Sequence, residues 1–216
     1  MLDQLMSNLI LRLFSIIIII PIFVYLVYLN NFFFNFFLIA LYFISFYELK
    51  FLIKKKIKFF FLLQILIIIF LFSFLKLRGD TFYDFVYLFW IISIVWLSDI
   101  GGYVFGKIFG GVKLSKWSPN KTVSGFLGSI IFSQFSIIIL VIYLPNFVIT
   151  NIHFIMQFFL CLISVFGDLF FSYLKRNFEI KDYSKLIPGH GGLLDRIDGL
   201  IFVLIVSFLL KLFNVL

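Results

Sequence analysis

Residues 58–76 read KFFFLLQILIIIFLFSFLK, and this run decides the fold class. Between its two terminal lysines only Gln64 and Ser73 are polar. A bilayer core of about 30 Å needs about 20 apolar residues in an α-helix, so the run predicts a transmembrane span. The whole chain has the same character, because 63% of its 216 residues are hydrophobic and only 13% are charged. With a mean hydropathy of +1.18, we expect an all-α integral membrane protein.

Other apolar runs of similar length lie on both sides of this one. They predict about seven transmembrane helices, which we place at 9–29, 32–52, 58–76, 82–99, 124–144, 151–174 and 197–215. No small-residue cleavage pattern follows the first run, so we interpret it as a retained span rather than a signal peptide. Cys161 has no partner for a disulfide, and it lies inside an apolar run.

The basic residues predict how these spans are oriented. They cluster after the second, fourth and sixth spans, at Lys50, Lys54, Lys55, Lys56 and Lys58, at Lys107, Lys113, Lys116 and Lys121, and at Lys175, Arg176, Lys181, Lys185 and Arg196. The alternate breaks carry only Lys76 and Arg78. The positive-inside rule therefore places these three loops and the N-terminus in the cytoplasm. The loops also explain the net charge of +8, so we expect no nucleic acid partner.

Ionisable residues inside apolar runs are costly, so Glu48, Asp99 and Asp168 each need an explanation. Four polar residues of the sixth span share one helix face, at spacings of four, four and three: Ser164, Asp168, Ser172 and Lys175. This face predicts a polar cavity open to the cytoplasmic side, with Asp168 about 10 Å below the loop. The alternative is a pair between Asp168 and a lysine that only holds helices together.

Two further carboxylates begin the predicted last span. Asp195 and Asp198 are three residues apart and share a helix face, whereas Arg196 points away from it. Because two carboxylates on one face repel each other, we expect a cation between them, and carboxylate oxygens suit hard ions such as Mg²⁺. Asp168 from the neighbouring helix would complete this metal site. The alternative is a helix N-terminal cap, which explains one acidic residue better than two.

The segment before Asp195 combines glycines with basic residues. Pro188, Gly189, His190, Gly191 and Gly192 predict a tight turn at the entry to the last span. Phosphate groups suit the surrounding donors, which are Lys175, Arg176, Lys181, Lys185, His190 and Arg196. A solvated basic loop is the alternative for single members of this set. Acids, cations and glycines together indicate transfer to or from phosphorus.

A second polar group follows the fourth span. It contains Asp99, Gly101, Gly102, Lys107, Gly110, Gly111, Lys113, Lys116 and the run from Ser118 to Thr122. The glycines do not fit a Walker A or dinucleotide-binding spacing, so an ordinary turn is the alternative to a nucleotide-binding loop. In the fifth span Gly125 and Ser129 are four residues apart and predict close helix packing.

From Ser172 to Asp198 the chain reads SYLKR, four other residues, KDYS, two others, and IPGHGGLLDRID. This segment resembles the C-terminal signature of phosphatidate cytidylyltransferases, also called CDP-diacylglycerol synthases. The stretches SDIGGY (98–103), FGK (105–107) and SPNKT (118–122) resemble the family's other cytoplasmic loop. Ser124 departs from the family pattern, since relatives usually carry an acidic residue there, and we assign it no catalytic role. The N-terminal half resembles the family only in its hydrophobicity.

The resemblance implies the reaction of CTP with phosphatidate to give CDP-diacylglycerol and pyrophosphate. It implies Mg²⁺, and it leaves room for a monovalent cation such as K⁺ and for a homodimer. We expect metal ligands at Asp168, Asp195 and Asp198, and catalytic roles for Asp195, Asp198, Lys175, Arg176, Arg196 and His190. The expected substrate contacts are Ser172, Lys121, Thr122, Lys181, Gly191, Gly192 and Asp99. The expected location is a bacterial inner membrane, with the active site facing the cytoplasm.

This interpretation divides the chain into N-terminal transmembrane helices, residues 1–80, and a C-terminal catalytic transmembrane region, residues 81–216, with cytoplasmic loops 100–123 and 175–196. Two other functions stay open. A CTP-dependent lipid kinase of the polyprenol or phytol type would use similar residues but release CDP. A cation-coupled transporter would use the carboxylates as ion ligands, but it predicts two related halves with broken helices, and the sequence lacks this symmetry.

Overall fold

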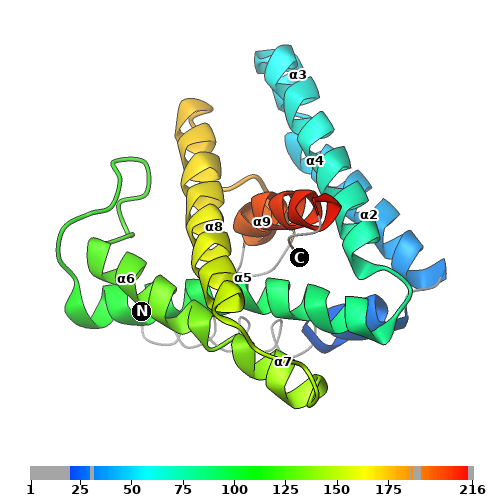
Figure 1. The fold of residues 1–216 in the computed structure, drawn as a ribbon. Coiled ribbons are helices and arrows are strands. Elements are labelled where there is room, and N and C mark those ends of the chain that lie inside the picture. Colours follow the sequence, from blue (N-terminus) through cyan, green and yellow to red (C-terminus); the bar gives the residue numbers. More distant parts are fainter. Residues whose placement is uncertain (1–19, 30–31, 185, 187–190, 214–216) are drawn as a thin grey trace, which may run out of the picture.

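The computed structural model describes residues 20–29, 32–184, 186 and 191–213, and this part of the chain is helical (Figure 1). Helix Ile20–Leu29 is followed by α2 (Phe32–Leu49), α3 (Leu52–Lys55), α4 (Ile57–Arg78), α5 (Phe82–Phe109), α6 (Val123–Gln134), α7 (Ile137–Tyr143), α8 (Asn151–Asn177) and α9 (Leu194–Leu212). Across these residues the structure describes no β-strand, and an isolated antiparallel bridge joins Lys113 to Thr122. The predicted all-α fold is confirmed.

Five helical segments of the described chain are long and apolar enough to cross a membrane: Phe32–Leu49, Ile57–Arg78, Phe82–Phe109, Val123–Tyr143 and Asn151–Asn177. They correspond to the second to sixth predicted spans. Most of the first predicted span lies outside the described residues. The last predicted span corresponds to α9, which has 19 residues and includes four charged side chains. The chain is therefore a multi-pass membrane protein, and a total of seven spans stays a prediction.

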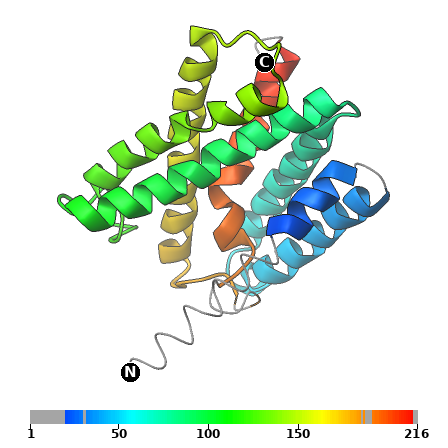
Figure 2. The same cartoon turned by 90° about the horizontal axis from the view of Figure 1, so that it is seen from below.

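Helix α5 continues to Phe109, so the predicted loop over residues 100–123 was wrong for residues 100–109. The reason is a close contact with α6, which lies beside α5 in both views (Figures 1 and 2). A Cβ atom on Gly102 would lie 2.7 Å from Ser129 Oγ, and one on Gly125 would lie 2.7 Å from the Gly102 carbonyl oxygen. Packing at this distance outweighs the cost of about 1 kcal/mol for each glycine inside a helix. The predicted packing role of Gly125 and Ser129 is confirmed.

The span Val123–Tyr143 is broken between α6 and α7, and Gln157 of α8 fills the break. Gln157 is completely buried. Its amide oxygen accepts hydrogen bonds from the Ser136 hydroxyl at 2.6 Å, from the Ile137 N–H at 2.9 Å and from the Trp90 indole N–H at 2.9 Å. One side chain therefore satisfies a backbone donor that the break leaves outside the helical ladder.

Replacing Gln157 with leucine is expected to lower the free energy of unfolding by about 2 kcal/mol, because buried donors lose their acceptor. Gln64 of α4 offers a matched control. It is also buried, but within the described residues neither atom of its amide has a hydrogen-bond partner. Gln64→Leu should therefore be neutral or stabilising. Thermal unfolding of both variants in detergent measures the contrast, and equal losses of stability would contradict it.

The three basic loops gather at one end of the molecule, around the C-terminal end of α8. The contacts are a hydrogen bond from Lys56 Nζ to the Asn177 carbonyl at 3.4 Å, an edge-on contact of Phe51 with Phe178, and an edge-on contact of Trp117 with Tyr173. Residues that are far apart in the chain thus form one polar end. The orientation of this end in a membrane stays a prediction.

Other polar contacts connect the ends of helices away from the basic loops. Arg78 donates from Nε to the Val27 carbonyl at 2.5 Å and from Nη2 to the Tyr28 carbonyl at 2.8 Å. Asp84 accepts hydrogen bonds from Thr81 in a capping box at the start of α5, and it also pairs with Lys211 of α9 at 2.7 Å. These contacts connect helix Ile20–Leu29 with α4, and α5 with α9.

Candidate functional site

Many of the predicted site residues lie where the last turns of α8, the start of α9 and the described parts of the loop between them meet. Asp195 is the centre of this arrangement. Its Oδ1 atom accepts a hydrogen bond from Lys175 Nζ at 2.7 Å, and its Oδ2 atom accepts from the backbone N–H groups of Tyr183 and Gly192, both at 3.0 Å. The side chains of Lys175 and Asp195 are only 13% and 5% exposed. Asp195 therefore holds both ends of the loop that carries the signature residues.

Asp168 lies on the same face of α8 and pairs with Lys121 from the loop between α5 and α6. The Ser172 hydroxyl lies 3.4 Å from Asp168 Oδ1, within hydrogen-bonding distance. Lys121 is 29% exposed and Asp168 is 25% exposed, so water reaches this ion pair. At Ser164 the same face is covered by α9, because a Cβ atom on Gly199 would lie 2.8 Å from Ser164 Oγ. The polar part of the face therefore begins at Asp168.

Three carboxylates from three helices interact electrostatically with one another: Asp99 of α5, Asp168 of α8 and Asp198 of α9. Asp99 is exposed and Asp198 is partly exposed, so both can meet a ligand. Asp198 accepts a hydrogen bond from the Gly199 N–H at 2.8 Å. The cations that act on this group are Lys121, Lys175 and Arg196. Repulsion among the carboxylates favours the binding of a further cation.

The three predicted metal ligands differ in how well they suit a metal ion. Asp195 already accepts three hydrogen bonds, whereas Asp168 and Asp198 repel each other. In the part of the chain that the structure describes, no three His, Cys, Asp or Glu side chains are grouped closely enough to hold a metal together. Asp168 and Asp198 therefore fit a hard cation such as Mg²⁺ better than Asp195 does. The Mg²⁺ site stays a prediction.

Several other predicted residues have contacts that bear on their roles. Arg176 is exposed, and its Nε donates a hydrogen bond to the Trp117 carbonyl at 3.3 Å. Lys181 and Arg196 are also exposed. Thr122 caps α6, because its hydroxyl accepts a hydrogen bond from the Gly125 N–H at 3.1 Å. The structure thus gives Thr122 a capping role and leaves the three cations accessible.

The glycine-rich turn is described only in part. Gly191 has a φ angle of +83°, which favours glycine, and a Cβ atom on Gly192 would lie 2.7 Å from Glu48 Oε1. Gly192 lies so close to Glu48 that a larger residue would not fit, which explains why the signature has a glycine at this position. His190 and residues 185 and 187–189 lie outside the described residues, so their predicted roles are untested.

Glu48 has a role that the sequence did not assign. It lies in the last turn of α2 and is 2% exposed. Its Oε1 accepts hydrogen bonds from the Ser184 hydroxyl at 2.6 Å and the Leu193 N–H at 2.8 Å, and its Oε2 accepts from the Leu194 N–H at 2.9 Å. The carboxylate therefore caps the N-terminus of α9 from another helix. The sequence signals Glu48 as an isolated acid in an apolar run, but its partners lie more than 130 residues away.

Tyr183 lies close to the carboxylates of Asp195 and Glu48. Burial raises the pKa of its hydroxyl well above the usual range, and Asp195, Asp198 and Glu48 raise it further. Tyr183 therefore stays neutral and adds no charge to the acidic group. Its ring contacts Phe171 of α8, which fixes the start of the loop against the helix.

The profile of the cytidylyltransferase family matches residues 51–213, which include all of these contacts except those of Glu48. The chain belongs to the cytidylyltransferase family. It is 41% identical over 136 residues to the phosphatidate cytidylyltransferase of Rickettsia conorii. The aligned region covers 57% of this chain and 59% of that protein. The chain is 40% identical over 146 residues to that of Bacillus subtilis, covering 65% and 53%. The chain spans about half the length of the curated relatives that it matches.

Membership of the family confirms the resemblance that the signature predicted. Ser124, where this chain departs from the family pattern, contributes to the base of the loop between α5 and α6. Its hydroxyl donates a hydrogen bond to the Gly110 carbonyl and lies 2.9 Å from Thr122 Oγ1. The position therefore closes the loop that presents Lys121.

Proposed function

We propose that this protein is a phosphatidate cytidylyltransferase, which transfers CMP from CTP to phosphatidate and releases pyrophosphate. The observation that carries the proposal is the fold of the signature segment 172–198. Asp195 and Glu48 fix its described parts beside Asp168 and Asp198. The phosphatidate cytidylyltransferases of R. conorii and B. subtilis are about 40% identical to the chain, which supports this reading.

In the proposed reaction a phosphate oxygen of phosphatidate attacks the α-phosphorus of CTP. A new P–O bond forms, the bond to the β-phosphate breaks, and pyrophosphate leaves with the electron pair. The nucleophile is already an anion, so the protein needs no strong base and contributes positioning and charge stabilisation. Mg²⁺ held by Asp168 and Asp198, with Asp195 as the third expected ligand, would supply neutralisation of phosphate charge.

The cations of the site divide into two groups by burial. Lys175 is buried against Asp195, so it keeps the loop in place and presents a fixed positive charge. Lys121 lies on a loop in a partly exposed pair, so its ammonium group can move from Asp168 to a phosphate oxygen. Arg176, Lys181 and Arg196 are exposed, so they are available to bind the pyrophosphate part of CTP. His190 remains an expected donor to a phosphate oxygen.

The proposal includes an orientation. A lipid substrate keeps its acyl chains in the bilayer while its phosphate meets a water-soluble nucleotide, so the site should lie at a membrane boundary. The basic loops that gather around the end of α8 support placing this boundary on the cytoplasmic side of a bacterial inner membrane. A homodimer and a monovalent cation such as K⁺ stay predictions.

The test is product analysis with membranes that contain the expressed protein, phosphatidate, Mg²⁺ and CTP labelled at the α- or γ-phosphate. We expect label from the α-phosphate in CDP-diacylglycerol and label from the γ-phosphate in pyrophosphate. Transfer of the γ-phosphate to a lipid alcohol, with release of CDP, would instead identify the lipid kinase alternative. Cation flux in proteoliposomes without any nucleotide product would identify the transporter alternative.

A further inference from the structure

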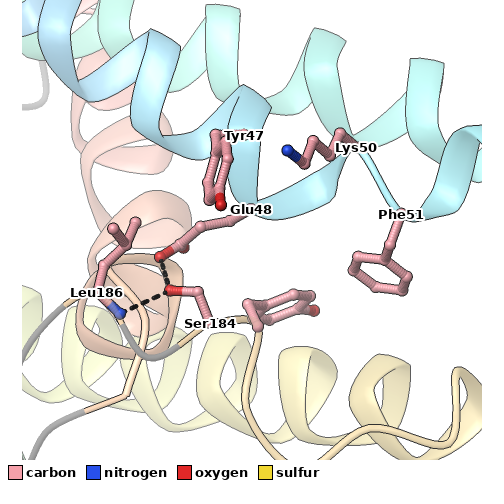
Figure 3. A pocket seen from close by; sticks show the side chains of 7 residues that line it. Tyr47, Glu48, Lys50, Phe51, Ser184 and Leu186 are labelled. Carbon is pink, nitrogen blue, oxygen red and sulfur yellow. Dashed lines mark hydrogen bonds between the residues drawn. The ribbon is translucent and has the colours of Figure 1, made fainter.

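A cavity of about 440 Å³ lies between the end of α2 and the loop that follows α8 (Figure 3). The side chains that line it include Tyr47, Glu48, Lys50, Phe51, Ser184 and Leu186. One wall comes from a predicted membrane span, and the other comes from the signature loop. The hydrogen bond from Ser184 to Glu48 joins the two walls, as the dashed line in Figure 3 shows. The cavity is therefore next to the proposed active site but does not include Asp168 or Asp198.

Lys50 lines this cavity, and three further exposed lysines follow it closely in the chain. Lys50 is exposed, and its Nζ lies 3.9 Å from the centre of the Tyr47 ring. Lys54, Lys55 and Lys58 follow within eight residues and are also exposed. Among the described residues, none of these lysines forms an ion pair. Glu48, the one acid in the lining, is buried with both oxygens bonded to Ser184, Leu193 and Leu194, and exposed Asp182 in the loop forms no ion pair with these lysines among the described residues. The accessible part of the site thus favours an anion.

The surroundings of the cavity favour a lipid over a water-soluble anion. The last turns of α2 expose Phe43, Phe46 and Tyr47, and the first turns of α4 expose Phe61 and Leu62. Both helices are apolar enough to cross a membrane. Acyl chains can therefore lie against these side chains while a headgroup reaches the lysines at the helix ends. A nucleotide has no acyl chains to place against this apolar border.

We propose that this cavity binds the headgroup of a lipid phosphomonoester, with Lys50 as the direct partner of the phosphate. Lys54, Lys55 and Lys58 attract the anionic lipid, and Tyr47 keeps the Lys50 side chain over the cavity. The proposal rests on the proposed function, because phosphatidate is a lipid of this class. It places the lipid at a point of entry from the bilayer, from which its phosphate moves on to the site beside Asp168 and Asp198. Zwitterionic phosphatidylcholine fits less well, because the lysines repel its quaternary ammonium group.

The kinetic test uses Lys50→Gln in mixed micelles of varied phosphatidate content. We expect the apparent KM for phosphatidate to rise about fivefold, the effect of one lysine on an anionic lipid, while the KM for CTP is unchanged. Lys76→Gln is the matched control, since Lys76 also lies over an aromatic ring, that of Phe72, but at the other end of α4. An unchanged KM for phosphatidate would overturn the proposal. A rise in the KM for CTP instead would show that the cavity takes nucleotide phosphate, which would also overturn it.

A binding test separates this proposal from the proposed function. The purified proteins are placed in phosphatidylcholine nanodiscs, and retention of labelled phosphatidate is measured without CTP. We expect Lys50→Gln to retain about fivefold less phosphatidate than wild type or Lys76→Gln. If wild type makes no CDP-diacylglycerol but this difference is found, the proposed function fails and the headgroup site stands. If wild type is active and the difference is absent, the headgroup site fails alone.

Discussion

Asp195→Asn is expected to reduce formation of CDP-diacylglycerol by about a hundredfold or more, the size of effect that follows when a catalytic group moves by about 1 Å. The substitution keeps the shape of the side chain but removes its charge. Lys175 is then left as a buried cation without its partner, and the amide presents an N–H₂ group to one set of donors. Breaking a buried pair in this way costs about 3 kcal/mol or more. We expect the signature loop to detach from the ends of α8 and α9.

The matched control is Asp182→Asn, in the same loop and exposed to solvent. It should keep near wild-type activity in the CTP assay. A second comparison separates the loop anchor from a metal ligand. If Asp168 holds Mg²⁺, Asp168→Asn should raise the Mg²⁺ concentration needed for half-maximal rate, while Asp195→Asn should lower the thermal stability of the purified protein together with its activity. Activity of Asp195→Asn within twofold of wild type would contradict the role that we give to this residue.

Glu48→Gln is expected to lower the free energy of unfolding by about 3 kcal/mol, because a charged acceptor of three buried hydrogen bonds becomes a neutral amide. One of the two oxygens is replaced by an N–H₂ group that faces N–H or O–H donors. The start of α9 then loses its cap, and this helix carries Asp195 and Asp198. We therefore expect the catalytic rate to fall by about tenfold or more, although Glu48 touches no reacting group.

Glu179→Gln is the control for this variant, since Glu179 is exposed just beyond the end of α8. Thermal unfolding in detergent and the CTP assay should both leave this control close to wild type. Equal stability of the two variants would mean that Glu48 does not hold the α9 terminus. Loss of activity in Glu48→Gln without loss of stability would point to direct contact with substrate instead.

Part of the candidate site could be predicted from the sequence, because the residues concerned lie close together in the chain. Asp168, Ser172, Lys175, Asp195 and Asp198 belong to one segment, and their spacing on helices is a local property. The structure pairs Lys175 with Asp195 and Lys121 with Asp168, and the roles of these residues in catalysis stay predictions. The contribution of Glu48 was beyond sequence reasoning, because its bonds to Leu193 and Leu194 depend on how α2 packs beside the signature loop.

The same distinction applies to the helices. The sequence by itself determined the membrane class, five of the spans and the family, because hydrophobic runs and short motifs are read without knowing what lies beside them. Tertiary contacts explain why α5 continues past Gly101 and Gly102, since α6 packs closely against both glycines. Contacts across the fold also decided which carboxylates serve as anchors. Asp195 and Glu48 are buried among backbone donors, whereas Asp99, Asp168 and Asp198 remain accessible to a ligand.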